Sequence, residues 1–230
     1  MNAAGGRSLN LTRHPCNEWA PAWSHDGRWI AFLCSSNLVV MRHDRRARRT
    51  VLRLPPQRAD DLAWSADDRQ LAFAGAQGIR VVSSDGTGLR RLSRGRDASP
   101  TWSRDGQTIA FGRELRGVSQ LLLMRADGTG HHRIATRAER PAFSPNGTTI
   151  AFLRNGSIWL MDADGGRQRR LPRGPRAGLV DLAWSPDGRY LAYQYQHYEL
   201  HVIALDGTYR RLLPSYGADI TGIDWGPTPS

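Results

Sequence analysis

One short phrase recurs six times along this chain at nearly constant spacing, and it limits the possible folds more than any other feature. An aromatic residue stands in every copy, with separations of 41, 38, 41, 41 and 41 residues, at Trp23, Trp64, Trp102, Phe143, Trp184 and Trp225. A repeat of this length indicates an array of one structural unit, so the function must depend on how the units stack.

Each copy of the phrase predicts a β-hairpin. In the third copy the turn reads Ser103-Arg104-Asp105-Gly106, with short apolar stretches on both sides. The Asp side chain can hydrogen-bond to nearby backbone and the Gly accepts a positive φ, while the apolar stretches are too short for helices. A third apolar stretch follows, and then in four of five units an Asp-Gly turn and a basic stretch such as Arg90-Arg91-Leu92.

Four antiparallel strands in a unit of this length are typical of a β-propeller blade, so we predict an all-β fold of four-stranded blades. The aromatic first strand should line the centre and the arginine-rich fourth strand the outer rim, where charge protects an exposed sheet edge from pairing with other chains. A β-sandwich, the alternative, predicts less regular spacing and no repeated phrase.

We expect one propeller domain over residues 1–230, and the ends of the array leave its closure open. The units span about 21–61, 62–99, 100–140, 141–181 and 182–222, followed by a terminal strand at 223–226. Five units are complete, so the prediction is a five-bladed or incomplete six-bladed ring with irregular terminal strands. An open arc and a fragment of a longer protein are the alternatives.

The repeat resembles those of the TolB-like β-propellers, a WD-like family. The similarity is closest at PAFSPNGTTIAFLRNGSIWLMDADG, residues 141–165, and extends over about residues 9–225. Two units depart from the family pattern, since residues 42–46 replace one Asp-Gly turn and Asp68 stands where a Gly is expected. In this family the repeat occurs in periplasmic partner-binding proteins, in peptidase-associated propellers and in polysaccharide lyases.

This resemblance favours a non-enzymatic propeller that binds a protein or peptide partner at the mouth of its channel. Three alternatives stay open: a lyase that acts on an acidic polysaccharide, a peptidase-associated propeller that contacts an acidic ligand, and a structural module of a longer protein. A fold shared by so many functions does not choose between them.

Acidic residues recur just before the predicted inner strands, where a propeller has the mouth of its channel. They are candidate ligand-binding residues, at Glu18, Asp60, Asp61, Asp97, Glu139, Asp181 and Asp219. One hypothesis is a carboxylate ring that binds a cationic peptide segment or a metal ion. The alternative is that these residues pair with neighbouring arginines.

The chain carries a net charge of +11, and every one of its basic residues is an arginine. Codon usage in a GC-rich genome would explain this bias. The alternative is an anion-binding rim, for which the candidate residues are Arg45, Arg46, Arg48, Arg49, Arg169 and Arg170. Nonspecific, salt-sensitive contact with polyanions is expected in either case.

The remaining reactive residues do not form a recognisable catalytic motif. Cys16 and Cys34 would lie at the same end of one hairpin, so either a disulfide typical of an oxidising compartment or two independent thiols would fit. The histidines match no zinc-binding spacing, and the chain has no nucleophile elbow or phosphate-binding glycine loop. We therefore expect no catalytic residue, no metal and no cofactor, which favours a protein that is not an enzyme.

No apolar stretch approaches the length of about 20 residues that a membrane-spanning helix needs. The first residues also lack the apolar centre of a signal peptide. We expect a soluble chain without an export signal. The compartment is left open because proteins of the family are often periplasmic or secreted, and the oligomeric state is open too.

Overall fold

The computed structural model describes residues 10–54, 59–75, 77–172, 174–175, 177–196, 199–208, 210–213 and 222–226. For residues 59, 60, 210 and 211 it describes the backbone alone. Asp219 therefore lies outside the described residues, as does the side chain of Asp60. No helix long and apolar enough to cross a membrane is found in the part of the chain that is described.

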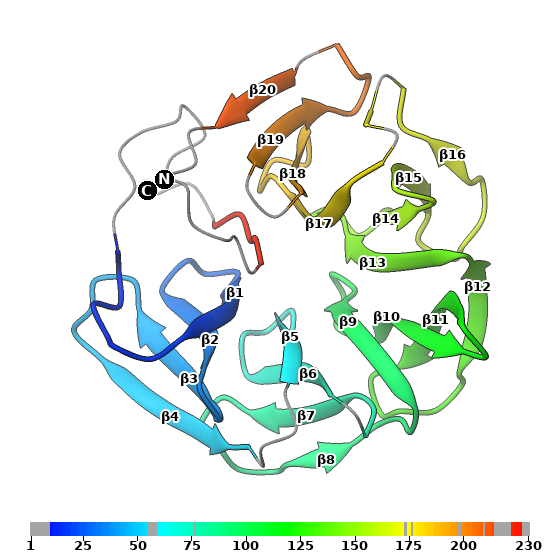
Figure 1. The fold of residues 1–230 in the computed structure, drawn as a ribbon. Coiled ribbons are helices and arrows are strands. Elements are labelled where there is room, and N and C mark those ends of the chain that lie inside the picture. The colour runs from blue at the N-terminus through cyan, green and yellow to red at the C-terminus, as the bar shows by residue number, and fades with distance from the viewer. Residues whose placement is uncertain are drawn as a thin grey trace.

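The described strands form five four-stranded antiparallel sheets, each in sequence order, which stand as blades around a common centre (Figure 1). Blade 1 holds β1 (Glu18–Trp23), β2 (Trp29–Cys34), β3 (Asn37–Arg42) and β4 (Arg48–Arg53). Blade 2 holds β5 (Ala59–Trp64), β6 (Gln70–Gly75), β7 (Arg80–Ser83) and β8 (Arg90–Arg91). Blade 3 holds β9 (Arg96–Trp102), β10 (Thr108–Leu115), β11 (Val118–Arg125) and β12 (His132–Thr136).

Blade 4 holds β13 (Ala138–Phe143), β14 (Thr149–Arg154), β15 (Ser157–Asp162) and β16 (Arg169–Arg170). Blade 5 holds β17 (Leu179–Trp184), β18 (Tyr190–Tyr195), β19 (Glu199–Ala204) and β20 (Arg210–Leu213). The aromatic first strand of every blade lies innermost and the basic fourth strand outermost (Figure 1). The predicted all-β propeller with five complete blades is confirmed.

The hydrophobic core lies between blades rather than within them. Leu33 and Val40 of blade 1, for example, pack with Leu71 and Phe73 of blade 2 in one buried cluster. Similar clusters join blades 2 and 3, 3 and 4, and 4 and 5. A single blade cannot bury both of its faces, so the blades stabilise each other through these shared clusters.

The Ser-x-Asp-Gly turns have one hydrogen-bond pattern throughout the ring. In blade 1, Ser24 Oγ donates to Asp26 Oδ1 (2.7 Å) and accepts from the Trp29 backbone N–H (2.9 Å). Blade 2 keeps these hydrogen bonds but departs from the sequence motif, because Asp68 occupies the glycine position with a φ of 57°. Its carboxylate accepts the backbone N–H of His25 (2.8 Å) and of Asp26 (2.9 Å), so the departure links blades 1 and 2.

The sixth copy of the phrase, residues 222–226, lies between blade 5 and blade 1 near the centre (red in Figure 1). Ile223 donates its backbone N–H to Asp181 Oδ2 in blade 5 (3.2 Å), and Asp224 Oδ2 accepts the Trp23 N–H of blade 1 (2.6 Å). Gly226 is so close to Trp23 that an added Cβ would lie 2.6 Å from the indole ring. This segment therefore joins the last blade to the first at the inner edge of the ring.

Candidate functional site

The inner strands enclose a central channel with a cavity volume of about 440 Å³. All six aromatic residues of the repeat line it: Trp23, Trp64, Trp102, Phe143, Trp184 and Trp225. Two indoles are fixed between blades, since Trp64 Nε1 donates to the Ala22 carbonyl (2.9 Å) and Trp184 Nε1 to the Ala142 carbonyl (2.9 Å). The turns that connect the first and second strands of the blades contribute His25, Arg104, Pro145 and Pro186 to the border of the cavity.

One position of the repeat, three residues before the aromatic residue, lines this channel in every copy. Its occupants differ in size and charge: Ala20, Asp61, Ser99, Arg140, Asp181 and Gly222. At Ala20, Ser99 and Arg140 the backbone has φ values of 51°, 50° and 54°. The strand pairing also shifts register here, for example between Trp19 and Ala22. This β-bulge, which recurs in all five blades, places one residue of each blade on the channel wall.

Three of these residues form a charged cluster. The Arg140 guanidinium lies 2.6 Å from Asp61 Oδ1 and 4.0 Å from Asp181 Oδ1. The second oxygen of each carboxylate accepts a backbone N–H, from Ser99 (3.0 Å) for Asp61 and from Ile223 (3.2 Å) for Asp181. Each carboxylate side chain is 18% exposed, which places both at the wall of the channel with limited access to solvent.

Burial raises the pKa of Asp181 to about 6. The Arg140 charge opposes this rise and the Asp61 charge adds to it, while hydrogen bonds from the backbone N–H groups of Ile223 and Leu182 lower the pKa. At neutral pH the Asp181 carboxyl is therefore mostly ionised, but burial makes its ionised form less stable than it would be in water. A further cation beside it would stabilise the ionised form.

The pKa of Arg140 is raised, because the charges of Asp61 and Asp181, with a smaller contribution from Glu139, outweigh the lowering effect of burial. Arg140 is therefore a permanent cation. With both carboxylates ionised, the cluster carries one excess negative charge. The other channel-facing positions between blades 5 and 2 hold the small residues Gly222 and Ala20.

The structure brings together two of the acidic residues selected from the sequence, Asp61 and Asp181, and places three others elsewhere. Glu18 accepts a hydrogen bond from Thr12 Oγ1 (2.5 Å) beside the disulfide that joins Cys16 and Cys34. Asp97 has a fully buried side chain that pairs with Arg113 at 2.6 Å. Glu139 is exposed and is not among the residues that line the cavity.

Arg140 is the residue of this site that the search for acidic residues missed. It occupies the same repeat position as Asp61 and Asp181, so an alignment of the six copies at that position would have found it. The acidic residues that lie outside the cavity stand one or two positions earlier in the repeat, as Glu139 and Asp97 do. In a strand, a shift of one residue changes the face to which a side chain points, and Asp97, two positions earlier, lies on the other side of the β-bulge.

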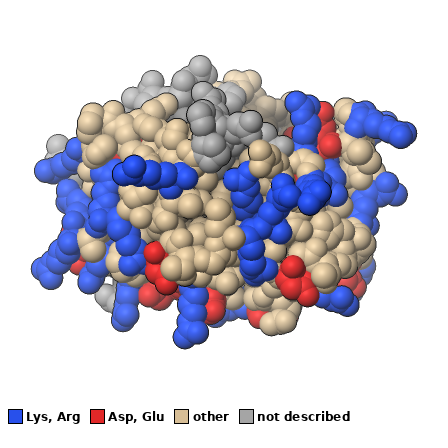
Figure 2. Space-filling model, turned by 90° about the horizontal axis from the view of Figure 1, so that it is seen from below, with Lys and Arg blue, Asp and Glu red and all other residues tan. Residues whose placement is uncertain are grey.

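The candidate anion-binding arginines are all exposed: Arg45, Arg46, Arg48, Arg49, Arg169 and Arg170. Figure 2 shows the outer rim from the side of β4 and β8, where blue side chains cover much of the surface and red ones are fewer. Arg48 and Arg49 also lie over the rings of Phe32 (5.5 Å) and Trp29 (5.4 Å). The two guanidinium groups therefore also stabilise blade 1 through cation–π contacts.

Among the described histidines, His25 is the one that lines the cavity. Its Nδ1 atom lies 2.9 Å from Asp68 Oδ1, in the contact between blades 1 and 2. His201 stacks on Tyr193 with ring centroids 5.0 Å apart, and His131 lies at the edge of Phe111. These histidines come from different blades and do not converge with the charged cluster. The cavity thus offers hydrogen bonding, charge and an aromatic wall, which are the means of binding.

Comparison with known proteins gives the same picture of the fold. Residues 2–229 match the PD40 family, described as the TolB β-propeller domain. The chain is 36% identical over 106 residues to a Tol-Pal system protein TolB from Gluconobacter oxydans, which covers 40% of this chain and 23% of that protein. It is 33% identical over 142 residues to a TolB homologue from Chlorobium luteolum, which covers 56% of this chain and 31% of that protein.

Among solved structures, TolB from Acinetobacter baumannii superposes with a TM-score of 0.79 at 18% sequence identity. The superposition covers 93% of this chain and 58% of that protein. The likeness to that structure concerns the fold. The chain spans less than a third of the length of the two sequence relatives that it matches.

Proposed function

Because this chain belongs to the TolB β-propeller family, we propose that its central channel binds an extended segment of a protein or peptide partner. The partner would place one basic side chain, lysine or arginine, against Asp181 and Asp61. The propeller would act as a binding module and not as an enzyme.

The excess negative charge of the channel cluster is the observation that carries this proposal. Arg140 compensates one of two carboxylates, with 2.6 Å to Asp61 and 4.0 Å to Asp181. Ala20 and Gly222 leave the side of the cluster away from Arg140 without a large side chain. A second cation fits there, and a partly buried ion pair is stronger than one in open solvent.

The walls of the cavity suit the rest of such a segment. The prolines Pro145 and Pro186 and the aromatic residues of the inner strands provide apolar surface along the way to the cluster. The methylene groups of a lysine or arginine side chain can pack on this surface while the charged group reaches the carboxylates. A cavity of about 440 Å³ is within the range of ordinary ligand sites.

The relatives support a protein partner. One is named as a protein of the Tol-Pal system, that is, as one component among others. The two carboxylates also suit binding better than proton transfer. Asp61 accepts a backbone N–H of β9 and Asp181 accepts one of the segment 222–226, so both are fixed in place as acceptors.

A selection from a random peptide library on the immobilised protein tests this proposal. We expect the enriched peptides to share a lysine or arginine. Replacing Asp181→Asn should weaken their binding by about 10–100-fold, the value of a hydrogen-bonded ion pair of about 1.5–3 kcal/mol. Affinities are measured by calorimetry, and circular dichroism checks that the variant is folded.

Asp164→Asn is the matched control, because Asp164 lies in an exposed outer turn where it accepts the Gly166 N–H (2.8 Å). This substitution makes the same chemical change away from the channel and should leave peptide affinity unchanged. Equal affinity of the wild type and Asp181→Asn would contradict the proposal. Peptides that share an acidic residue and depend on Arg140 would contradict it too.

A further inference from the structure

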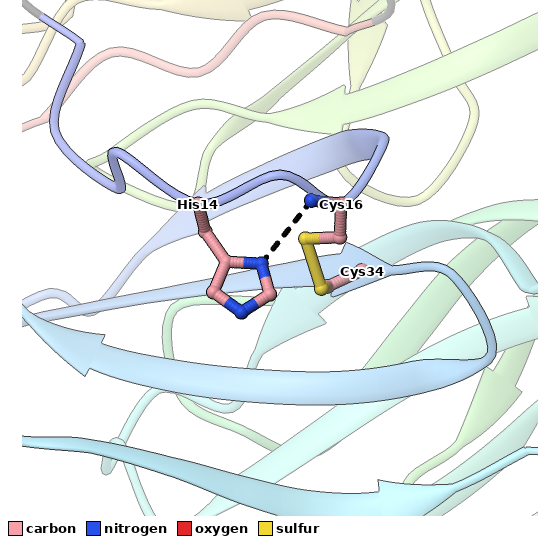
Figure 3. A group of neighbouring side chains, drawn as sticks. All are labelled: His14, Cys16 and Cys34. Carbon is pink, nitrogen blue, oxygen red and sulfur yellow. Dashed lines mark hydrogen bonds between the residues drawn. A yellow bond between two sulfur atoms is a disulfide. The ribbon is translucent and has the colours of Figure 1, made fainter.

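A second group of reactive side chains lies outside the channel, where the chain leads into β1. Cys16 and Cys34 form a disulfide with Cα atoms 5.6 Å apart, and the His14 imidazole lies beside it (Figure 3). The candidate ligand atoms of these three residues are all within 4.8 Å of one another.

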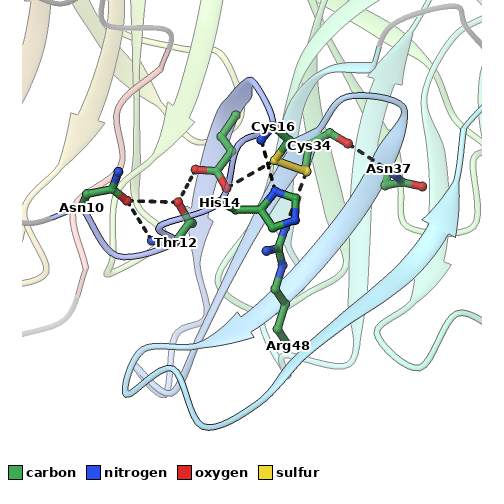
Figure 4. Close-up of a disulfide and its surroundings, with 8 residues drawn as sticks. Asn10, Thr12, His14, Cys16, Cys34, Asn37 and Arg48 are labelled. Atoms are coloured by element: carbon green, nitrogen blue, oxygen red, sulfur yellow. Dashed lines mark hydrogen bonds between the residues drawn. A yellow bond between two sulfur atoms is a disulfide. The ribbon is translucent and has the colours of Figure 1, made fainter.

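The disulfide also contacts Glu18 and Arg48, and Figure 4 shows Arg48 beside it. Glu18 Oε1 lies 3.5 Å from Cys16 Sγ, and Arg48 Nη2 lies 3.5 Å from Cys34 Sγ. His14 Nδ1 accepts the Cys16 backbone N–H at 3.2 Å, which orients the ring and keeps this nitrogen unprotonated. Two sulfurs and an imidazole thus meet at one place, and a carboxylate contacts one of the sulfurs.

We propose that this group is a zinc site when the disulfide is reduced. Two thiolates, one imidazole and one carboxylate form a tetrahedral donor set of the kind that Zn²⁺ prefers. Two thiolates and Glu18 bring three negative charges, which Zn²⁺ and the Arg48 guanidinium balance. His14 Nδ1, which accepts the Cys16 N–H and is therefore unprotonated, is the nitrogen that would bind the metal, after a small rotation of the exposed side chain that breaks this hydrogen bond.

The conversion needs an external dithiol as the reductant. The S–S bond between Cys16 and Cys34 breaks, two electrons pass from the dithiol to these sulfurs, and the dithiol becomes a disulfide. Its two protons end on the two cysteine thiols. Binding of Zn²⁺ then releases both protons to solvent, because the thiolates are the ligands.

Both states would tie the segment that precedes β1 to blade 1. Cys16 and Leu11 pack over a buried cluster that includes Phe32 and Met41. This cluster lies on the face of blade 1 that points away from blade 2. The disulfide makes this connection covalently, and zinc would make it through coordination. A reduced, metal-free chain would have neither connection, so the cover of this cluster would depend on redox state and metal supply.

The test uses the full chain, free of affinity tags, with Zn²⁺ and Co²⁺ as probes. After reduction and removal of the reductant under nitrogen, about one Zn²⁺ per chain should bind in competition with a chelating dye, as for a four-ligand site. Co²⁺ should give the visible bands of tetrahedral cobalt and a thiolate-to-cobalt charge-transfer band. The oxidised protein should show neither.

Variants identify the ligands. His14→Ala should weaken zinc binding by about 100-fold or more, since loss of even an outer-shell partner costs about 10–100-fold. His132→Ala, which removes an exposed histidine of blade 3, is the matched control and should change nothing. The double variant Cys16→Ser with Cys34→Ser should lose the charge-transfer band.

Zinc affinity that is the same in the oxidised and reduced proteins would overturn the proposal, and so would binding that the double cysteine variant retains. Far-UV circular dichroism shows whether the reduced protein is still folded. If the reduced protein is unfolded both with and without Zn²⁺, the site does not exist and the proposal is also overturned.

Discussion

Asp224 is the residue whose loss should most affect closure of the ring. Its two oxygens accept the backbone N–H of Trp23 (2.6 Å) and of Trp225 (2.8 Å). The bond to Trp23 connects residues that are 201 positions apart in the sequence. Asp224→Ala removes both acceptors and leaves the last blade without this connection to blade 1.

The expected cost follows from the geometry of these bonds. A hydrogen bond to a charged group contributes about 1.5–3 kcal/mol when well formed. Two effects reduce this value for Asp224. Burial among protein atoms raises its pKa, which means that the ionised form is partly destabilised. Although many protein atoms surround Asp224, its side chain keeps contact with solvent on the channel side, and this solvent screens the charge. We therefore expect Asp224→Ala to lower the free energy of unfolding by about 1–2 kcal/mol.

Urea unfolding followed by tryptophan fluorescence measures this change, and hydrogen exchange locates it. Exchange should accelerate in β1 and not in β10, which lies across the ring. Asp127→Ala is the matched control, because Asp127 accepts two hydrogen bonds from Thr129 within one exposed turn. If Asp224→Ala costs no more than Asp127→Ala and leaves exchange in β1 unchanged, residues 222–226 do not close the ring.

Three further predictions concern stability. Gly226→Ala places a Cβ 2.6 Å from the Trp23 ring, so thermal unfolding should show a loss of about 1–3 kcal/mol, and an unchanged melting temperature would speak against this contact. Burial raises the pKa of Asp181 from 3.8 to about 6, so in this window the folded state binds a proton that the unfolded chain has lost. The free energy of unfolding should therefore fall by on the order of 3 kcal/mol as pH rises through the window, and Asp181→Asn should remove this slope in urea titrations; an identical slope in both proteins would refute the argument. Reduction of the Cys16–Cys34 disulfide without zinc should cost about 3 kcal/mol by the loop-entropy estimate, and equal denaturation midpoints for both redox forms would contradict it.

The blades were predictable because each of their determinants is local and repeated. The turn around Ser24 and Asp26 recurs with the same hydrogen bonds in the other blades, and the aromatic residue marks each inner strand. Such a pattern needs no knowledge of distant contacts. The ring closure was harder to predict, because the bond from Trp23 to Asp224 connects opposite ends of the chain.

The channel cluster was predictable only in part, for a reason that lies in the strand geometry. The sequence identifies Asp61 and Asp181 as acidic residues before an inner strand, but Asp97 and Glu139 meet the same criterion and do not line the channel. The β-bulge decides which position faces the channel, and it depends on pairing with the second strand. Arg140 could not be recognised by its charge, since arginines are common throughout this chain.

Asp68 shows that a departure from a repeat can have a structural purpose. It replaces the expected glycine yet adopts a positive φ of 57°, and it accepts two backbone N–H groups of blade 1. Burial alone would raise the pKa of Asp68, but the His25 ring and these backbone N–H groups together lower it. The cost of the unusual backbone conformation is thus offset by contacts that the sequence pattern could not reveal.

A crystal structure of the protein with a selected peptide tests the binding channel most directly. The account predicts a lysine or arginine of the peptide inside the central cavity, with its charged nitrogen about 3 Å from a carboxylate oxygen of Asp181 or Asp61. A peptide bound along the outer strands, or one that places a carboxylate on Arg140, would contradict it.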